Sequence, residues 1–142
     1  MLVRCLYASR AATPVAGNVL DDILRQSRIK NAKSGITGML CFANQVFVQV
    51  LEGGRREVSD LMGAIFRDGR HQDVQILLFE EIPERRFRDW SMGQVNVEKV
   101  NPALLLKYGE RAELDPYRVS GHATLALMLE LVATGAIVHR GT

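Results

Sequence analysis

The chain has 142 residues, 47% of them apolar and 24% charged, which suits a single globular domain with its own core. Its net charge of +2 comes from scattered basic residues, with Arg55-Arg56 and Arg85-Arg86 only short pairs, so the charge does not indicate nucleic-acid binding. The N-terminus lacks a signal-peptide pattern, no apolar run approaches the ~20 residues of a membrane span, and no CxxC or HExxH spacing indicates a metal site. We therefore expect a cytoplasmic, metal-free protein that contacts no membrane, with Cys5 and Cys41 reduced in its core.

The first 95 residues alternate between strand and helix patterns. Period-two runs predict strands over residues 2–8, 36–42, 46–52, 74–82 and 90–95. A first helix is predicted to be capped by Asn18 and to end near Asn31. A second helix is predicted to open at Gly53-Gly54 and to stop at Asp68-Gly69, with Val58, Leu61, Met62, Ile65 and Phe66 on its buried stripe.

This order predicts an α+β fold, a ferredoxin-like βαββαβ sheet with a fifth strand. Right-handed crossovers place both helices on one face of the sheet. The first and third strands are then central neighbours, so Tyr7 and Gln49 can meet beneath the groove between the helices. The fold thus predicts a pocket with a polar floor.

The C-terminal part has a different character. Asn101-Pro102 predicts a short helix ending at Tyr108-Gly109, and Ser120 starts a longer one. Residues 123–132 are apolar around more than one helix face, which predicts that this helix covers the open face of the sheet and meets a second copy of the chain. Residues 136–142 are expected to be loose or to add a short strand.

Gln49 places an uncharged amide in a strand that otherwise reads as buried. Side chains of a strand alternate between its faces, so Gln49 shares one face with Phe47 and Leu51. An unpaired polar group there would cost roughly 1–3 kcal/mol, so the amide needs a partner from a strand, a water or a ligand. On this evidence alone, a satisfied core glutamine is the simpler interpretation.

Five motifs stand in register along the chain. They are Tyr7-Ala8-Ser9, Asn31 with Gly35-Ile36-Thr37-Gly38, Phe47 to Gly53, Asp68-Gly69-Arg70-His71, and Phe87 to Met92. In order and spacing the set resembles the BLUF family, blue-light sensors that use flavin. The resemblance covers residues 1–98 as the photosensor domain, and residues 99–142 look like the helical extension of short, single-domain members, with no effector attached.

The resemblance implies a photoreceptor that is not an enzyme and that signals to a separate downstream protein. Tyr7 looks like the electron and proton donor to the excited flavin, and Gln49 like the switch amide. Trp90 and Met92 match a pair that packs near Gln49 and relays the change. The expected flavin contacts are Tyr7, Ile23, Asn31, Phe47, Gln49, Ile65, Asp68, Arg70 and His71. The family cofactor is FAD, and FMN or riboflavin remains an alternative.

Two positions depart from the family pattern. Lys30 stands where several members carry His or Asn, so we assign it no flavin role, and Ala64 replaces an arginine found in some members. Two other functions stay open: a flavin-binding oligomeric module without photochemistry, and a small ferredoxin-like hydrolase using His71 and Asp68. The second lacks a nucleophile, because Ser9 has no evident base in the sequence.

Overall fold

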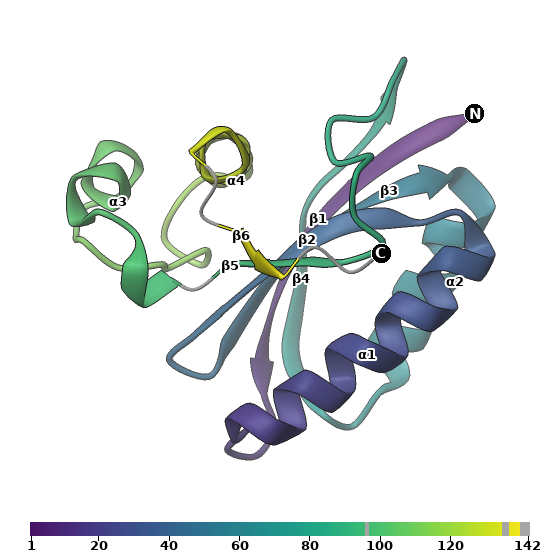
Figure 1. The fold of residues 1–142 in the computed structure, drawn as a ribbon, viewed down its shortest axis with the longest axis horizontal. Coiled ribbons are helices and arrows are strands. Elements are labelled where there is room, and N and C mark those ends of the chain that lie inside the picture. The colour runs from purple at the N-terminus through teal and green to yellow at the C-terminus, as the bar shows by residue number, and fades with distance from the viewer. Residues whose placement is uncertain (96, 135–136, 140–142) are drawn as a thin grey trace.

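One mixed sheet separates two layers of helices (Figure 1). The computed structural model describes residues 1–95, 97–134 and 137–139. Its strands are β1 Leu2–Ala11, β2 Thr37–Ala43, β3 Val46–Gly54, β4 His71–Ile82, β5 Gly93–Val95 and β6 Ile137–His139. Its helices are α1 Gly17–Ser34, α2 Arg55–Arg67, α3 Pro102–Tyr108 and α4 Gly121–Ala133, with a 3₁₀ turn η1 at Val97–Lys99.

The strand order β4-β1-β3-β2-β5-β6 confirms the predicted ferredoxin-like core. β1 and β3 are antiparallel central neighbours, and β5 adds to β2 in parallel. β6 extends that edge at residues 137–139, which agrees with the short add-on strand that is one of the two expectations for residues 136–142. Residues 136 and 140–142 lie outside the described part. The fold class is therefore the one that the element order predicts.

Helices α1 and α2 cover one face of the sheet, as predicted (Figure 1). Leu20 and Leu24 of α1 and Val58 and Met62 of α2 pack into one cluster with the inward side chains of β1 and β3. Phe66 is an exception, because it is 52% exposed rather than buried. Its neighbour Ile65 lies on the side of α2 that lines a cavity, so the buried stripe is narrower than the sequence suggested.

Helix α4 covers the opposite face of the sheet (Figure 1). Its buried side chains Leu125, Leu127, Met128 and Leu131 share a cluster with side chains of β1, β2 and β3 and with Leu105 of α3. Most of the apolar surface on this helix is thus covered within one chain. Leu129 and Val132 are only partly buried, so self-association stays a prediction.

The start of α4 rests directly on the backbone of β4. The register of β4 on β1 skips Leu77, which lies between the partners of Leu6 and Tyr7 and forms a β-bulge. A Cβ atom added to Gly121 would lie 2.6 Å from the Leu77 carbonyl oxygen. Only glycine therefore allows this approach without a shift of one of the two elements.

The ends of α1 differ from the prediction. The helix begins at Gly17 after Ala16, which makes no side-chain cap, so Asn18 lies inside the first turn instead of capping it. It runs on to Ser34 and ends on Gly35, whose φ of 69° is the left-handed conformation that glycine adopts readily. The Asn31 carbonyl accepts hydrogen bonds from the N–H groups of Gly35 and Ile36, which fixes Asn31 at the end of the helix. The later caps follow the sequence, with Asn101 before α3 and Ser120 before α4.

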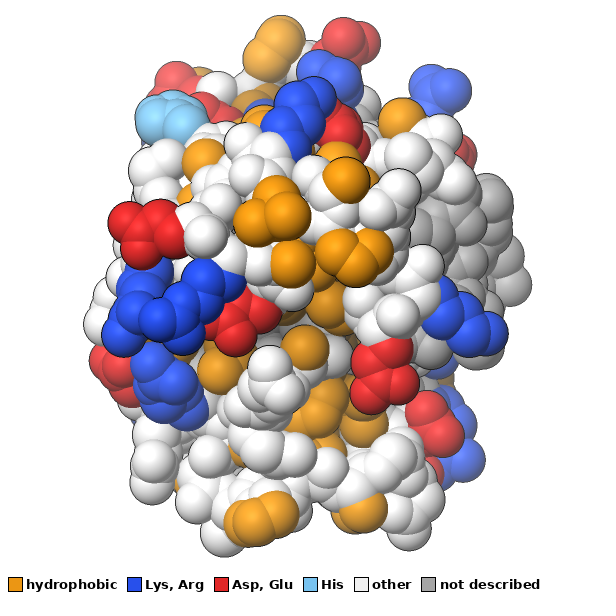
Figure 2. Space-filling view, turned by 90° about the vertical axis from the view of Figure 1, so that its left-hand side faces the viewer, with side chains coloured by type: hydrophobic (Ala, Val, Ile, Leu, Met, Phe, Trp, Pro, Cys, Tyr) orange, Lys and Arg blue, Asp and Glu red, His pale blue; other side chains and the backbone are white. Residues whose placement is uncertain are grey.

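A hollow lies at the end of the sheet that carries η1 and α3 (Figure 2). In the described part of the chain, its lining includes the apolar side chains of Phe42, Val95, Val97, Leu105 and Leu114. Within the same residues, no helix has both the length and the apolarity required to cross a membrane.

Candidate functional site

A cavity opens between α1 and α2, above the central strands of the sheet. It encloses about 800 Å³ of empty space, part of it open to solvent. All of the predicted flavin contacts line it, namely Tyr7, Ile23, Asn31, Phe47, Gln49, Ile65, Asp68, Arg70 and His71. The topology brings these residues together from helices α1 and α2, from strands β1, β3 and β4, and from the turn that enters β4.

Tyr7 and Gln49 form the floor of the cavity. They stand directly opposite each other on β1 and β3, and they are 2% and 8% exposed. The Tyr7 hydroxyl donates a hydrogen bond to Gln49 Oε1. Burial raises the pKa of Tyr7, and the nearby Cys5 and Asp68 raise it further. The phenol consequently keeps its proton at neutral pH.

The other end of the Gln49 amide contacts Met92. Gln49 Nε2 donates to Met92 Sδ over 3.1 Å, and Met92 is fully buried. A thioether sulfur is only a weak acceptor. The amide therefore has one strong partner on β1 and one weak partner in the segment that precedes β5.

Helix α1 holds the backbone of the same segment. Arg28 Nε donates to the Met92 carbonyl over 3.0 Å, and Asn31 Nδ2 donates to the Ser91 carbonyl over 3.2 Å. Arg28 Nη2 is buried and has no hydrogen-bond partner among the described residues. Burial lowers the pKa of this guanidinium, although Asp21 opposes the shift. One wall of the cavity and the segment beside Gln49 are thus connected through two side chains.

A polar group lies where the chain enters β4. Asp68 and Arg70 form an ion pair of 2.7 Å, and the hydrogen bond from Arg70 lowers the pKa of Asp68 to about 2. Burial lowers the pKa of His71, so its ring is neutral at pH 7. Its Nδ1 lies 2.8 Å from Ser9 Oγ, which corrects the expectation that Ser9 has no base nearby. Because Ser9 is fully buried, this pair does not supply the accessible nucleophile that a hydrolase needs.

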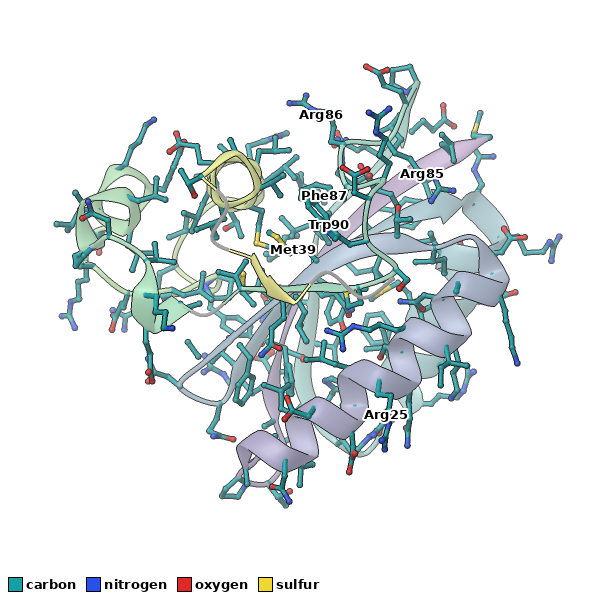
Figure 3. All side chains as sticks on the ribbon, viewed as in Figure 1. Arg25, Met39, Arg85, Arg86, Phe87 and Trp90 are labelled. Atoms are coloured by element: carbon teal, nitrogen blue, oxygen red, sulfur yellow. The ribbon has the colours of Figure 1, made fainter. Side chains whose placement is uncertain are left out.

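Trp90 lies on the other side of the sheet from Gln49. With Phe87 and Met39 it belongs to the cluster beneath α4, and Figure 3 shows all three labelled side chains on that side. In the strand that the sequence predicts over residues 90–95, Trp90 and Met92 would share a face. The strand begins only at Gly93, and the irregular segment before it sends the two side chains to opposite faces.

Six further residues line the cavity: Gln26, Ser27, Lys30, Leu40, Leu61 and Ala64. Helical spacing could have identified Ser27, four residues after Ile23, and Leu61, four residues before Ile65. Leu40 is the cross-strand partner of Gln49. Lys30, to which no role was assigned, also stands in the wall, and its ammonium has no ion-pair partner in the described residues.

The lining suits a flat heteroaromatic ring. Ile23 and Ile65 supply apolar side chains from the two helices, and the amides of Asn31 on α1 and Gln49 on β3 supply donors and acceptors. Within the residues described, no cluster of His, Cys, Asp and Glu side chains could hold a metal ion. The lining residues that the structure describes offer hydrogen-bonding amides and a buried phenol.

The chain is similar to known light sensors in sequence and structure. A family model described as BLUF, "Sensors of blue-light using FAD", matches residues 2–93. Photoactivated adenylate cyclase subunit beta of Euglena longa is 34% identical over 98 residues, which are 68% of this chain and 11% of that protein. The blue light- and temperature-regulated antirepressor BluF of Escherichia coli (strain K12) is 31% identical over 87 residues, 61% of this chain and 22% of that protein.

Two solved structures resemble the fold over nearly its full length. The photo-activated state of BlsA aligns with a TM-score of 0.79 and 30% identity, covering 100% of this chain and 99% of that one. The dark-state structure of BlrB, a BLUF protein, aligns with a TM-score of 0.74 and 34% identity, covering 94% and 96%. By contrast, the chain spans only about a tenth to a fifth of the curated relatives named above.

Proposed function

The chain belongs to the BLUF family of blue-light sensors that use FAD, and on this premise we propose that Tyr7 and Gln49 carry its light response. The protein is a blue-light photoreceptor of the flavin-binding type. The observation that carries the proposal is the hydrogen-bond chain from the Tyr7 hydroxyl through the Gln49 amide to Met92 Sδ.

The cavity residues would hold the flavin without a covalent bond. Ile23 and Ile65 would flank the ring, and Asn31 and Gln49 would bind its polar edge. Phe47, Asp68, Arg70 and His71 would complete the contacts, also on the evidence of their place in the lining. Bound flavin supplies the absorption of blue light and accepts an electron and a proton. FAD is the expected form, and identification of the flavin released from purified protein tests it against FMN and riboflavin.

Tyr7 is suited to donate an electron and a proton together. Its raised pKa keeps the phenol protonated in the dark, and its buried hydroxyl has Gln49 Oε1 as acceptor. A tyrosine that has lost its proton can no longer donate to that oxygen. Gln49 can restore a bond by turning its amide, so that Nε2 donates to the Tyr7 oxygen.

That rotation would cost Met92 its contact. After the turn, Gln49 Oε1 faces the Met92 sulfur, and two acceptors cannot form a hydrogen bond. Met92 is then free to move within the segment that α1 holds through Arg28 and Asn31. In this proposal Met92 is the first relay, and Trp90 takes part from the far face of the sheet, beneath α4.

The output of the sensor is proposed to be a protein contact rather than a reaction. Residues 1–98 would form the photosensor and residues 99–142 the extension that reports its state, because α4 packs on the far face of the same sheet. Some relatives are named as adenylate cyclase subunits, but this chain matches only 11% of the length of such a protein. We propose a separate downstream partner, self-association of the sensor, and a cytoplasmic location. The cytoplasmic location agrees with Cys5 and Cys41, which are buried and form no disulfide.

Illumination of the purified, flavin-loaded protein tests the function. A sensor should be yellow and should show a red shift under blue light that reverses in the dark. A protein that binds flavin but keeps one spectrum would instead be the passive module. A colourless protein that takes up no added flavin would contradict the proposal.

A further inference from the structure

A row of three charged side chains and one threonine crosses the face of the sheet opposite the cavity. Glu80 of β4, Arg4 of β1, Glu52 of β3 and Thr37 of β2 are successive cross-strand partners. Arg4 Nε donates to Glu52 Oε2 over 2.8 Å, and Arg4 Nη1 donates to Glu80 Oε1 over 3.0 Å. Charges thus alternate along the row, with Glu52 beneath the segment between β4 and β5.

Glu52 is a completely buried carboxylate with donors around both oxygens. Besides Arg4, the backbone N–H groups of Arg86 and Phe87 donate to its Oε1 over 2.9 and 2.7 Å. A carboxylate is an acceptor only, so it can satisfy three donors at once. An amide of the same size would turn its NH₂ group toward at least one of these donors.

The segment that Glu52 holds is the one that passes the switch amide. Phe87 is 0% exposed and Trp90 is 3% exposed, and both lie on the α4 side of the sheet (Figure 3). Met92 then lies on the other face, where it contacts Gln49. Arg85 Nη1 fixes the start of the segment to Thr37 Oγ1 over 2.9 Å. The Glu52 anchors thus lie five and six residues before Met92.

We propose that Glu52 is a positioning residue of the light response, which sets where the 85–92 segment lies and therefore how Met92 meets Gln49. The inference rests on the proposed function, because Glu52 acts through Met92 and lies on the opposite face of β3 from the cavity. Glu52 takes no part in the photochemistry itself, but fixes the path of the backbone at Arg86 and Phe87.

Glu52→Gln tests the proposal, with Glu80→Gln as the matched control. Both variants remove one carboxylate from Arg4, but among the residues that the structure describes, Glu80 bonds to Arg4 and not to the 85–92 segment. Trp90 is the only tryptophan in the chain, so its fluorescence reports the segment directly. In flavin-loaded Glu52→Gln, we expect quenching of Trp90 by acrylamide to rise roughly twofold or more, because the segment opens locally. Dark recovery of the red-shifted state should become roughly threefold faster or more. Glu80→Gln should match the wild type in both.

Glu52→Asp carries the test if Glu52→Gln does not fold. It keeps the negative charge beside Arg4 but is one methylene too short to keep all three donors, so it should also expose Trp90. A folded Glu52 variant with wild-type quenching and recovery overturns the proposal. If quenching rises in the Glu52 variant alone while even the wild type shows no red shift, the anchor is supported and the proposed photoreceptor function fails instead.

Discussion

Replacing Gln49 with leucine separates a switch from a buried structural amide. Gln49→Leu removes the acceptor of the Tyr7 hydroxyl, and Tyr7 is only 2% exposed. An unsatisfied buried hydroxyl costs about 1–3 kcal/mol. For a chain of this size, that loss corresponds to a fall in melting temperature of roughly 3–12 °C. The variant should still fold and bind flavin, since the apolar walls of the cavity are unchanged.

A double-mutant cycle shows how much of the lost free energy of unfolding comes from the hydrogen bond between Tyr7 and Gln49. Tyr7→Phe leaves the Gln49 oxygen without its donor, whereas the double variant removes both partners together. The free energy of unfolding lost in the double variant should therefore be smaller than the sum of the two single losses, by about 1 kcal/mol. Thermal unfolding followed by circular dichroism, at one fixed flavin excess, measures all four proteins. Additive losses would mean that the two side chains do not interact.

The light response gives the second half of this test. Gln49→Leu should be yellow and light-blind, because leucine cannot exchange a donor for an acceptor. Gln49→Glu is a useful companion, since it keeps the size but has no amide to rotate. A normal, reversible red shift in the leucine variant would refute the glutamine switch.

Further predictions follow from the same site. Tyr7→Phe should bind flavin with little loss of affinity but form no red-shifted state, as a difference spectrum under blue light will show. Denaturation should release all flavin, because burial raises the pKa values of Cys5 and Cys41 to about 12 and keeps both thiols unreactive; chromophore remaining with the precipitate contradicts this. The red shift should persist up to pH 10, since the raised pKa of Tyr7 preserves the phenol, and a loss between pH 7 and 10 counts against it. The pKa of His71 is lower in the folded chain than its ordinary value of ~6.5, so the unfolded chain takes up the proton first. Stability should therefore fall as the pH drops below about 6.5 and through the lowered pKa, and this fall should be smaller in His71→Gln.

The central part of the site could be predicted because it depends on regular strands. Period-two alternation and the strand order together place Tyr7 opposite Gln49, and the structure has them as direct partners. Spacing on the helices places Ile23 and Ile65 on the stripes that face the sheet, the family resemblance puts them beside the ring, and the structure has both in the lining of the cavity. In regular elements, position along the chain determines the direction of a side chain.

Side-chain directions could not be predicted where the backbone is irregular, as in the segment before β5. Trp90 and Met92 are two residues apart, but without a strand their directions are set by anchors on Glu52, Asn31 and Arg28, which no local pattern reveals. The contact of Ser9 with His71 joins positions 62 residues apart. Such pairs depend on where the turn before β4 places the histidine.

The bulge at Leu77 has a mechanical consequence. Tyr7 pairs with Ile76, the residue next to the bulge, while the carbonyl of Leu77 supports the first turn of α4 at Gly121. Side chains usually separate the backbone of a helix from that of a sheet, but at this contact the two backbones lie directly against each other. A displacement of β4 beside Tyr7 therefore cannot be absorbed there, and α4 has to tilt or lift with the strand. Near its other end, α4 buries Leu131 in the core and bonds to Lys107 and Tyr108 of α3 through Glu130, so a movement that starts at Gly121 would be passed on to α3.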